Sequence, residues 1–399
     1  MFGSRLLLTT ALCLGYVAII LGQTVTPAPA CTDQIRDENC TLPACRCSGN
    51  DIPGNLDIAQ VPQLVFLTFD DAVAIQNIDF YREVLFHRKN PNNQSITATF
   101  FITHEYTNYT LVHELYRLNH DIALHSMTHN PLTAYWASLN ATMWQREVVD
   151  QREQLASFAR VPATIQGLRA PFLQIGGDPM YTVLAQGGFK WECSRPTLNF
   201  RKPGLWPYTA DYRSSQDCQI APCPVGQYKG FWTVPMIDMM GEDNEGCAMV
   251  DTCTPVPETA DATYNLLMKN FNDQYTGSEA NRAPFGIFTH AAWLNGTDDE
   301  GIAARREGYS RFLDYLGTKN DVYIVGISQA LEWVKNPIPL AQIANSTLFK
   351  NPTRANNCPT VYNCRYAPEQ TPFPTERYMS LCSPCPPMYP WIGNPLGRP

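Results

Sequence analysis

The sequence LVFLTFDD at residues 64–71 joins an apolar run to two adjacent carboxylates, those of Asp70 and Asp71. An apolar run of this length is typical of a buried strand. We therefore expect the two carboxylates to lie at the tip of that strand rather than on an exposed face. Taken alone, such a pair is more often a helix cap or a solvated turn, so a chemical role depends on partners elsewhere in the chain.

Two histidines follow a second apolar run. The sequence HSMTH at residues 125–129 comes directly after residues 122–124 and places His125 and His129 four positions apart. Two imidazoles and one carboxylate are three N/O ligands for a divalent metal such as zinc, and they leave a coordination position for water. The second carboxylate can then act as the base. Without the carboxylates, the two histidines would more often be a pair on a helix surface.

Apolar runs and helical stretches alternate along the chain, and this alternation predicts a distorted (β/α) barrel with about seven or eight strands. The predicted strands are Leu64–Phe69, Thr97–Ile102, Ile122–Leu124, Ile165–Leu168, Phe189–Trp191, Phe231–Ile237, Phe285–Phe288 and Val322–Ile327. The predicted helices are Asn108–Leu118, Ala141–Ala159, Asp261–Asn272 and Arg305–Gly317. The polar residues that follow these strands are Asp70, Asp71, His125, His129, Arg169, Glu192 and His290. Because a barrel carries its active site at the C-terminal ends of its strands, we expect these residues to meet there.

The first residues predict secretion. Residues 1–22 carry one positive charge, at Arg5, before an apolar run and small residues, which is typical of a signal peptide. A membrane anchor is the alternative, but no basic cluster follows the run, and Pro27 and Pro29 come soon after it. We therefore expect an extracellular protein with no stable membrane insertion.

Cysteine usage agrees with that compartment. Because Cys13 lies in the signal segment, 13 of the 14 cysteines remain, and all of these but Cys193 cluster near the two ends or between Cys218 and Cys253. Behind a signal peptide, disulfides are the favoured interpretation, even for Cys382-Ser-Pro-Cys385, which could also be half a zinc knuckle. The odd number leaves either one free thiol or one intermolecular bridge. We expect disulfides to fasten both ends onto the barrel.

These features divide the chain into a signal peptide (residues 1–22), a Cys-containing N-terminal segment (23–60), a catalytic domain (61–345) and a Pro- and Cys-rich C-terminal extension (346–399). The formal net charge of -8 argues against nucleic acid or another polyanion as a partner. Glycan acceptor sequons occur at Asn93, Asn108, Asn140, Asn295 and Asn345. We expect a glycosylated monomer.

Four motifs carry a resemblance to a known family. TFDD at 68–71, HSMTH at 125–129, RAPF at 169–172 and FTH at 288–290 resemble, in order and spacing, the motifs of the polysaccharide deacetylase family, carbohydrate esterase family 4. Segments such as TFFITHEY at 99–106, QGLRAPF at 166–172 and SQALEW at 328–333 are similar to arthropod chitin deacetylases of the short type, which lack a separate chitin-binding module. The resemblance covers roughly residues 31–340.

The resemblance implies roles for the first two motifs. Asp71, His125 and His129 would bind Zn²⁺ or Co²⁺, and Asp70 would take a proton from the attacking water. Arg169 would orient Asp70 and hold it ionised, because a carboxylate beside a cation keeps its charge at neutral pH.

The resemblance also implies an acid and an oxyanion donor. His290 would protonate the leaving amine, and the backbone N–H at Phe172 would stabilise the oxyanion. The family supports this histidine with an Asp of its fourth motif, and the aligned residue here is Glu192. Trp293 and Trp232 are candidates for stacking on a sugar ring, although tryptophans are more often core residues.

Two functions remain open at this point. The first is the metal-dependent hydrolysis of N-acetyl groups on chitin or chitooligosaccharides, which releases acetate. The second is a secreted chitin-binding or matrix-organising protein with little turnover, for which Glu192 in place of Asp is the sequence hint.

Overall fold

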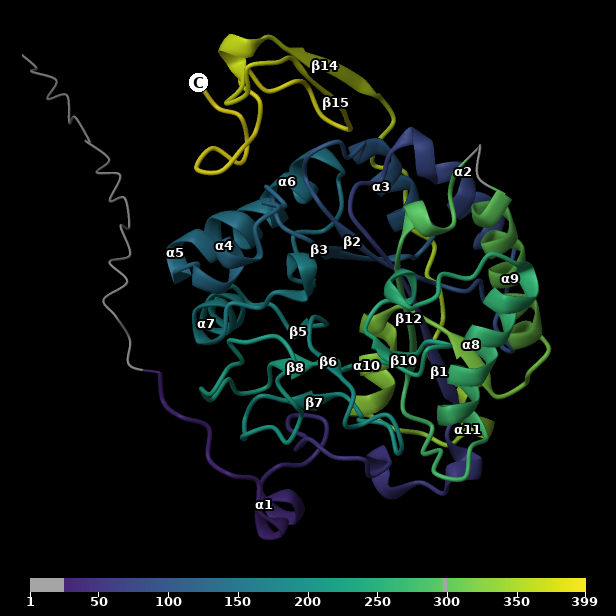
Figure 1. The fold of residues 1–399 in the computed structure, drawn as a ribbon. Coiled ribbons are helices and arrows are strands. Elements are labelled where there is room, and N and C mark those ends of the chain that lie inside the picture. The colour runs from purple at the N-terminus through teal and green to yellow at the C-terminus, as the bar shows by residue number, and fades with distance from the viewer. Residues whose placement is uncertain (1–24, 297–299) are drawn as a thin grey trace, which may run out of the picture.

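The chain folds around one curled, mainly parallel sheet that is surrounded by helices (Figure 1). The computed structural model describes residues 25–296 and 300–399, so the predicted signal peptide lies outside the described residues. In spatial order the sheet contains β12 (Phe285–His290), β1 (Gln63–Asp70), β2 (Thr99–Ile102), β3 (Asp121–Leu124), β4 (Gly167–Leu168), β5 (Trp191–Glu192), β8 (Trp232–Thr233) and β7 (Tyr208–Thr209). A ninth strand, β13 (Val322–Ile324), pairs with the first half of β1, and β2 pairs with its second half.

Strand β1 is buried along its whole length, which explains its continuous apolar sequence. Successive side chains of a strand point to opposite faces. Leu64 and Phe66 accordingly belong to the core inside the curled sheet, whereas Val65 and Leu67 belong to the core beneath the helices. By the same alternation, the side chain of Asp70, which lies four residues beyond Phe66 on the strand, faces the inside of the barrel.

Helices cover the outside of the sheet, as Figure 1 shows for α2, α3, α8 and α9. The helices are α1 (Asp33–Glu38), α2 (Ile75–Val84), α3 (Tyr109–Arg117), α4 (Thr133–Ser138), α5 (Ala141–Trp144), α6 (Asp150–Phe158), α7 (Asp178–Gln186), α8 (Ala260–Tyr275), α9 (Glu300–Gly317), α10 (Ile327–Lys335) and α11 (Leu340–Ile343). The apolar residues of helix α10 join the interior core, where Trp333 stacks on Trp206 with ring centroids 5.9 Å apart. This helix helps to fill the interior of the barrel.

The predicted distorted (β/α) barrel is confirmed, and it is open: β12 and β7 form the two edges of the main sheet. Some elements differ from the sequence prediction. The single strand expected at Phe231–Ile237 is two short strands, β8 and β9 (Met236–Ile237), which belong to different sheets. The strand expected to reach Ile327 ends at Ile324, and α10 begins at Ile327. Helices α2 and α7 were not predicted.

The disulfides lie within the two ends and the central segment. The bridges are Cys31–Cys47, Cys40–Cys45, Cys218–Cys223, Cys247–Cys253, Cys358–Cys382 and Cys364–Cys385. Each closes a loop inside its own segment, so the expectation that bridges fasten the ends onto the barrel is wrong. Both ends are held on the barrel by hydrogen bonds and packing instead, for example from Arg46 N to Thr209 and from Cys382 N to the carbonyl of Phe158. Among the described cysteines Cys193 is free and buried.

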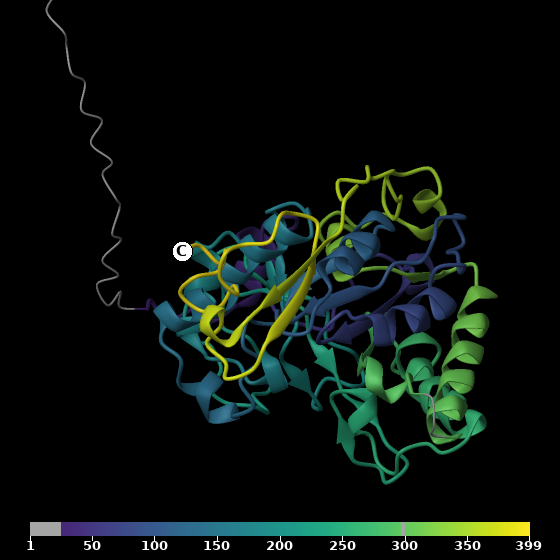
Figure 2. The same cartoon turned by 90° about the horizontal axis from the view of Figure 1, so that it is seen from above.

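The C-terminal extension contains a β-hairpin, β14 (Tyr362–Tyr366) with β15 (Arg377–Leu381), that lies beside α3 and the loop after β2 (Figure 2). An ion pair of 3.0 Å joins Arg377 to Glu105 of that loop. The preceding residue of the loop, His104, bonds the carbonyl of Pro390 through Nε2 at 2.8 Å. The remaining short strand pairs are β6 (Pro196–Thr197) with β9, and β10 (Met239–Met240) with β11 (Gly246–Cys247). Within residues 25–296 and 300–399, no helix combines the length and the apolar character needed to cross a membrane.

Candidate active site and metal centre

Asp70 and Asp71 end strand β1 but their side chains take different directions. Asp70 is 4% exposed and continues the inward series of the strand. Asp71 has a φ of 82°, in the left-handed region that aspartate tolerates better than most residues, and its N–H bonds the carbonyl of Phe101 at 3.0 Å. The reversal of the backbone at Asp71 leaves its side chain half-exposed at the mouth of the barrel.

His125 and His129 come from the loop after β3. The Nδ1 of His125 is 2.8 Å from the carbonyl oxygen of Arg169, so Nδ1 carries the proton and Nε2 keeps its lone pair. Burial, together with the nearby ring of His129, lowers the pKa of His125 to about 3, which keeps the ring neutral. The N–H of His129 donates to the hydroxyl of Ser126 at 3.1 Å, and this bond fixes the backbone of the second histidine.

The three side chains fit a divalent cation. The Oδ1 of Asp71 lies 3.4 Å from Nε2 of His129 and 3.8 Å from Nε2 of His125, and all three candidate ligand atoms lie within 4.8 Å of one another. Ligand atoms around a tetrahedral zinc with bonds of ~2.0–2.2 Å stand about 3.3 Å apart. The set therefore needs little movement to hold such an ion, and three protein ligands leave one position open.

A buried glutamate supports the loop that carries both histidines. Glu147 accepts hydrogen bonds from the N–H of Met127 at 3.2 Å and from the N–H and hydroxyl of Thr128 at 2.9 and 2.7 Å. It also accepts one from Tyr135 at 2.7 Å. Glu147 lies in a π-helical turn, η3 (Gln145–Val149), between α5 and α6, a feature that often accompanies functional sites. Sequence reasoning missed this residue, because neither its position in a helix nor its spacing marks it.

Arg169 is fully buried and fixes Asp70. Its guanidinium donates to Oδ1 of Asp70 at 2.6 Å, to the hydroxyl of Thr68 at 2.8 Å and to the carbonyl of Cys193 at 2.8 Å. The rings of Phe101 and Phe288 lie against the guanidinium, with centroids 4.0 and 5.0 Å away. Burial opposes the charge of Arg169, but Asp70 outweighs it and raises the pKa of the guanidinium. The other oxygen of Asp70, Oδ2, is 3.8 Å from Nε2 of His125 and so lies beside the candidate metal centre.

His290 stands opposite Asp70 on the neighbouring strand. The register of β1 and β12 pairs Asp70 with His290, and adjacent strands lie about 4.8 Å apart. The Nδ1 of His290 is 2.6 Å from Oδ2 of Asp251, which also accepts the N–H of His290 at 3.1 Å. Burial lowers the pKa of His290, but the bond to Asp251 and the charges of Asp70, Asp251 and Asp71 outweigh it and raise that pKa to about 9.

The expected partner of His290 requires a correction. Trp191 and Cys193 point into the interior core, so Glu192 between them points to the opposite face of β5. There its carboxylate accepts hydrogen bonds from the hydroxyl of Tyr181 and the N–H of Ser194, each at 2.8 Å. The carboxylate on His290 is that of Asp251, in a short loop closed by the Cys247–Cys253 bridge. No motif spacing in the sequence marks Asp251.

The comparisons with known proteins decide the family. The model of the polysaccharide deacetylase family matches residues 58–190. Chitin deacetylase 8 of Bombyx mori is 39% identical over 388 residues, which are 96% of this chain and 97% of that protein. The chain belongs to the polysaccharide deacetylase family. Chitin deacetylase 1 of Bombyx mori is 34% identical over 93% of this chain and 69% of its own length. Among solved structures, a putative polysaccharide deacetylase from Mycobacterium smegmatis aligns with a TM-score of 0.44 and 18% identity over 76% of this chain and 98% of its own.

The structure is compatible with the oxyanion-donor role expected for Phe172, but not with the sugar-stacking role expected for Trp293 and Trp232. Phe172 has a φ of 56° in the first turn of a 3₁₀-helix, where N–H groups have no partner within the helix, and its ring lies 4.9 Å from that of His129. Its N–H is therefore available near the metal centre. Trp293 is 6% exposed in the outer core and Trp232 is 2% exposed in the inner core, so neither offers a ring face to a sugar. Their assignment as substrate-binding residues is corrected.

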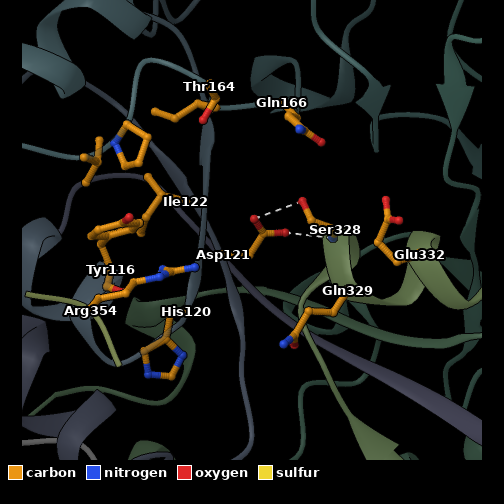
Figure 3. A pocket seen from close by; sticks show the side chains of 13 residues that line it. Tyr116, His120, Asp121, Ile122, Thr164, Gln166, Ser328, Gln329, Glu332 and Arg354 are labelled. Carbon is orange, nitrogen blue, oxygen red and sulfur yellow. Dashed lines mark hydrogen bonds between the residues drawn. The ribbon is translucent and has the colours of Figure 1, made fainter. Parts of the chain in front are cut away.

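A cavity of about 360 Å³ lies at the opposite end of the strands (Figure 3). Asp121, the first residue of β3, lines it and accepts hydrogen bonds from the N–H and hydroxyl of Ser328 at 2.9 and 3.1 Å. These bonds cap the first turn of α10.

Among the described residues, the one group of histidine, cysteine and acidic side chains placed to hold a metal is the one at the barrel mouth.

Proposed function

We propose that this chain is a metal-dependent chitin deacetylase that hydrolyses N-acetyl groups of chitin or chitooligosaccharides to acetate and glucosamine units. One observation carries the proposal: Asp71, His125 and His129 converge beside a base, Asp70, and an acid, His290, that are paired on adjacent strands. The relatives named chitin deacetylase support chitin as the substrate.

Asp70 is the base of this mechanism. The hydrogen bond from Arg169 occupies Oδ1 of Asp70. The oxygen that faces the metal centre, Oδ2, is therefore the atom that accepts the proton of the attacking water. Arg169 cannot rotate away, because Thr68, Cys193 and two aromatic rings also hold it.

The electrophile is activated at the mouth of the barrel. Asp71, His125 and His129 would hold a divalent cation, and their N and O ligand atoms suit zinc or cobalt. Such a cation would polarise the amide carbonyl and lower the pKa of a bound water toward neutrality. The N–H of Phe172 donates to the oxyanion, and the ring of Phe172 shields His129 from solvent on one side.

His290 is the acid. Its raised pKa of about 9 keeps the ring protonated at neutral pH. Nδ1 is held by Asp251, so Nε2 is the atom that gives a proton to the departing amine. The case for a non-catalytic matrix protein depended on Glu192, and Asp251 removes that argument because it supplies the carboxylate that His290 needs.

The six disulfides among the described residues suit an oxidising compartment, in agreement with the secretion predicted from residues 1–22. The absence of nucleic-acid partners, the monomeric state and the use of the glycan sequons stay predictions.

Metal removal tests the proposed function. Chelation should abolish acetate release from chitin oligomers, and zinc or cobalt should restore it, while the circular dichroism of the apo protein stays unchanged because the barrel core does not contain the metal. His129→Ala removes one of three ligands and should abolish activity at stoichiometric metal. The matched control is His87→Ala, an exposed histidine away from the site, which should keep full activity. Full activity of His129→Ala at sub-stoichiometric metal would contradict the assignment.

A further inference from the structure

A groove of about 250 Å³ lies between the C-terminal hairpin and two loops at the catalytic end of the barrel. The loop after β1 contributes Ile75, the loop after β2 contributes Tyr106 and Asn108, and the hairpin contributes Asn363, Tyr378 and Ser380. The volume is somewhat below the ~300–1,000 Å³ of pockets that enclose a whole drug-sized ligand. It therefore suits one unit of a longer ligand.

The groove displays large side chains to solvent. Ile75 and Tyr106 are each 72% exposed and Tyr378 is 65% exposed. Tyr106 has a φ of 66°, a left-handed conformation that is rare for a bulky residue. Such strain persists only where the surroundings enforce it, and here the ion pair of the preceding Glu105 with Arg377 ties this loop to the hairpin. The structure thus holds two tyrosines from distant segments in place on one surface.

The chemistry of the lining points to a neutral sugar. Among the residues that the structure describes, no Asp, Glu, Lys, Arg or His lines the groove, so the described lining does not select an anion or a cation. Tyrosine rings offer flat apolar faces with a polar tip. The amide of Asn363 and the hydroxyl of Ser380, which bond each other at 2.9 Å, offer donors and acceptors in the lining of the same groove.

The groove lies close to the catalytic site along the chain. The metal ligand Asp71 lies three residues before Ala74, which lines the groove, and three residues span at most ~11 Å. The two loops are also joined directly, because the N–H of Asn108 bonds the carbonyl of Val73 at 2.7 Å. A polymer held with one acetyl group at the metal centre would extend past this rim.

We propose that the groove between the C-terminal hairpin and the loops after β1 and β2 binds a further N-acetylglucosamine unit of the chitin chain whose acetyl group is being cut, with Tyr106 and Tyr378 as its walls. The proposal rests on the proposed function for the identity of the ligand. It gives the C-terminal extension, which lies outside the part matched by the family model, a role in selecting longer substrates.

The test compares a short with a long substrate. For Tyr106→Ala, Tyr378→Ala and the double variant, KM for chitopentaose should rise about three- to tenfold per tyrosine, from the loss of ring contact, with kcat unchanged. KM for chitobiose should stay at the wild-type value, because a dimer at the metal centre does not fill the groove. Tyr378→Phe keeps the ring, so its KM for chitopentaose should rise less than that of Tyr378→Ala. Val361→Ala trims an exposed residue just before β14 that does not line the groove, so it should behave as wild type.

The outcomes separate this proposal from the proposed function. Unchanged kinetics on chitopentaose, or equal losses on both substrates, would overturn the groove as a subsite while leaving the deacetylase assignment intact. If wild type released no acetate, the proposed function would fail, and calorimetric titration of the full-length protein with chitopentaose would still decide the groove: equal affinity of wild type and the double variant overturns it. Asn108 is also a sequon residue, so a glycan found on it by intact-mass measurement would overturn the proposal, because that glycan would fill the groove.

Discussion

Asp70 and Asp121 are acidic residues at opposite ends of the same sheet, and their partners differ. Asp70, the last residue of β1, gives one oxygen to Arg169 and turns the other toward the histidines. Asp121, the first residue of β3, gives both oxygens to Ser328 at the start of α10. Burial raises the pKa of Asp121, and its hydrogen bonds only partly oppose this. A carboxylate with both oxygens occupied supports the fold, whereas one with a free oxygen beside metal ligands can do chemistry.

The largest effect is expected for Asp70→Asn. The amide still offers an oxygen to Arg169, which limits the cost of leaving that guanidinium buried without a carboxylate. It cannot accept a proton, so kcat should fall by ~10²–10⁴-fold, the contribution of general base catalysis. Metal content and affinity for chitin oligomers should stay close to wild type, since Asp71, His125 and His129 are unchanged.

Steady-state acetate release together with metal analysis checks this prediction. A melting curve serves as the folding control. Loss of the metal along with the activity would mean that Asp70 is a ligand rather than the base, and activity near the wild-type value would remove Asp70 from the mechanism.

The mouth of the barrel was more predictable from sequence than the rest of the molecule. Parallel strands bring their C-terminal ends together whatever lies between them. The residues found in this way lie at the last position of a strand or shortly after it: Asp70, Asp71, His125, His129, Arg169 and His290. Asp251 and Glu147 could not be found in this way. Asp251 is placed by a local disulfide loop and Glu147 by a π-helical turn, and neither leaves a periodic pattern. Glu192 was misassigned because a single step along a strand reverses the direction of the side chain.

The burial of the tryptophans and the disulfide pairing were not predictable for related reasons. The sequence around Trp232 and Trp293 does not show whether their rings face a sugar or the core. Only the positions of the two residues in the folded structure show that both rings are buried in the core. Thirteen cysteines allow many pairings, and the observed bridges join cysteines that are 5 to 24 residues apart in the sequence.

A second prediction tests whether Asp251 or Glu192 is the carboxylate that raises the pKa of His290. His290 must be protonated to act as the acid, so kcat/KM should fall as the pH rises through its pKa, which is about 9 without a metal and lower once a cation offsets the charge of Asp71. Asp251→Asn removes the hydrogen bond that raises this pKa, so the alkaline limb should move toward ~6.5, and activity at pH 8 should fall by up to about thirtyfold.

The pH profiles of kcat/KM for acetate release measure this shift. Glu192→Asp is the matched control: its carboxylate bonds Tyr181 on the other face of β5, so the limb should stay where it is in wild type. The reverse pattern would restore Glu192 as the partner of His290. The same pairing with Asp251 stabilises the folded chain below about pH 6.5, and that contribution is lost as the pH rises through about 9.

The smallest effect on catalysis is expected for Asp121→Ala, at the structural end of the comparison. The change leaves the N–H of Ser328 at the start of α10 without its acceptor, and the loss of such a cap costs about 1–2 kcal/mol of unfolding free energy. Asp121 and His125 are four residues apart along an extended strand, hence ~13 Å apart, so kcat and KM should remain within about twofold of wild type. Denaturant unfolding and acetate release on the same preparation measure both quantities. A large loss of kcat with little loss of stability would show that the two ends of the barrel are coupled through β3, and that a fully occupied carboxylate at the far end also tunes the site.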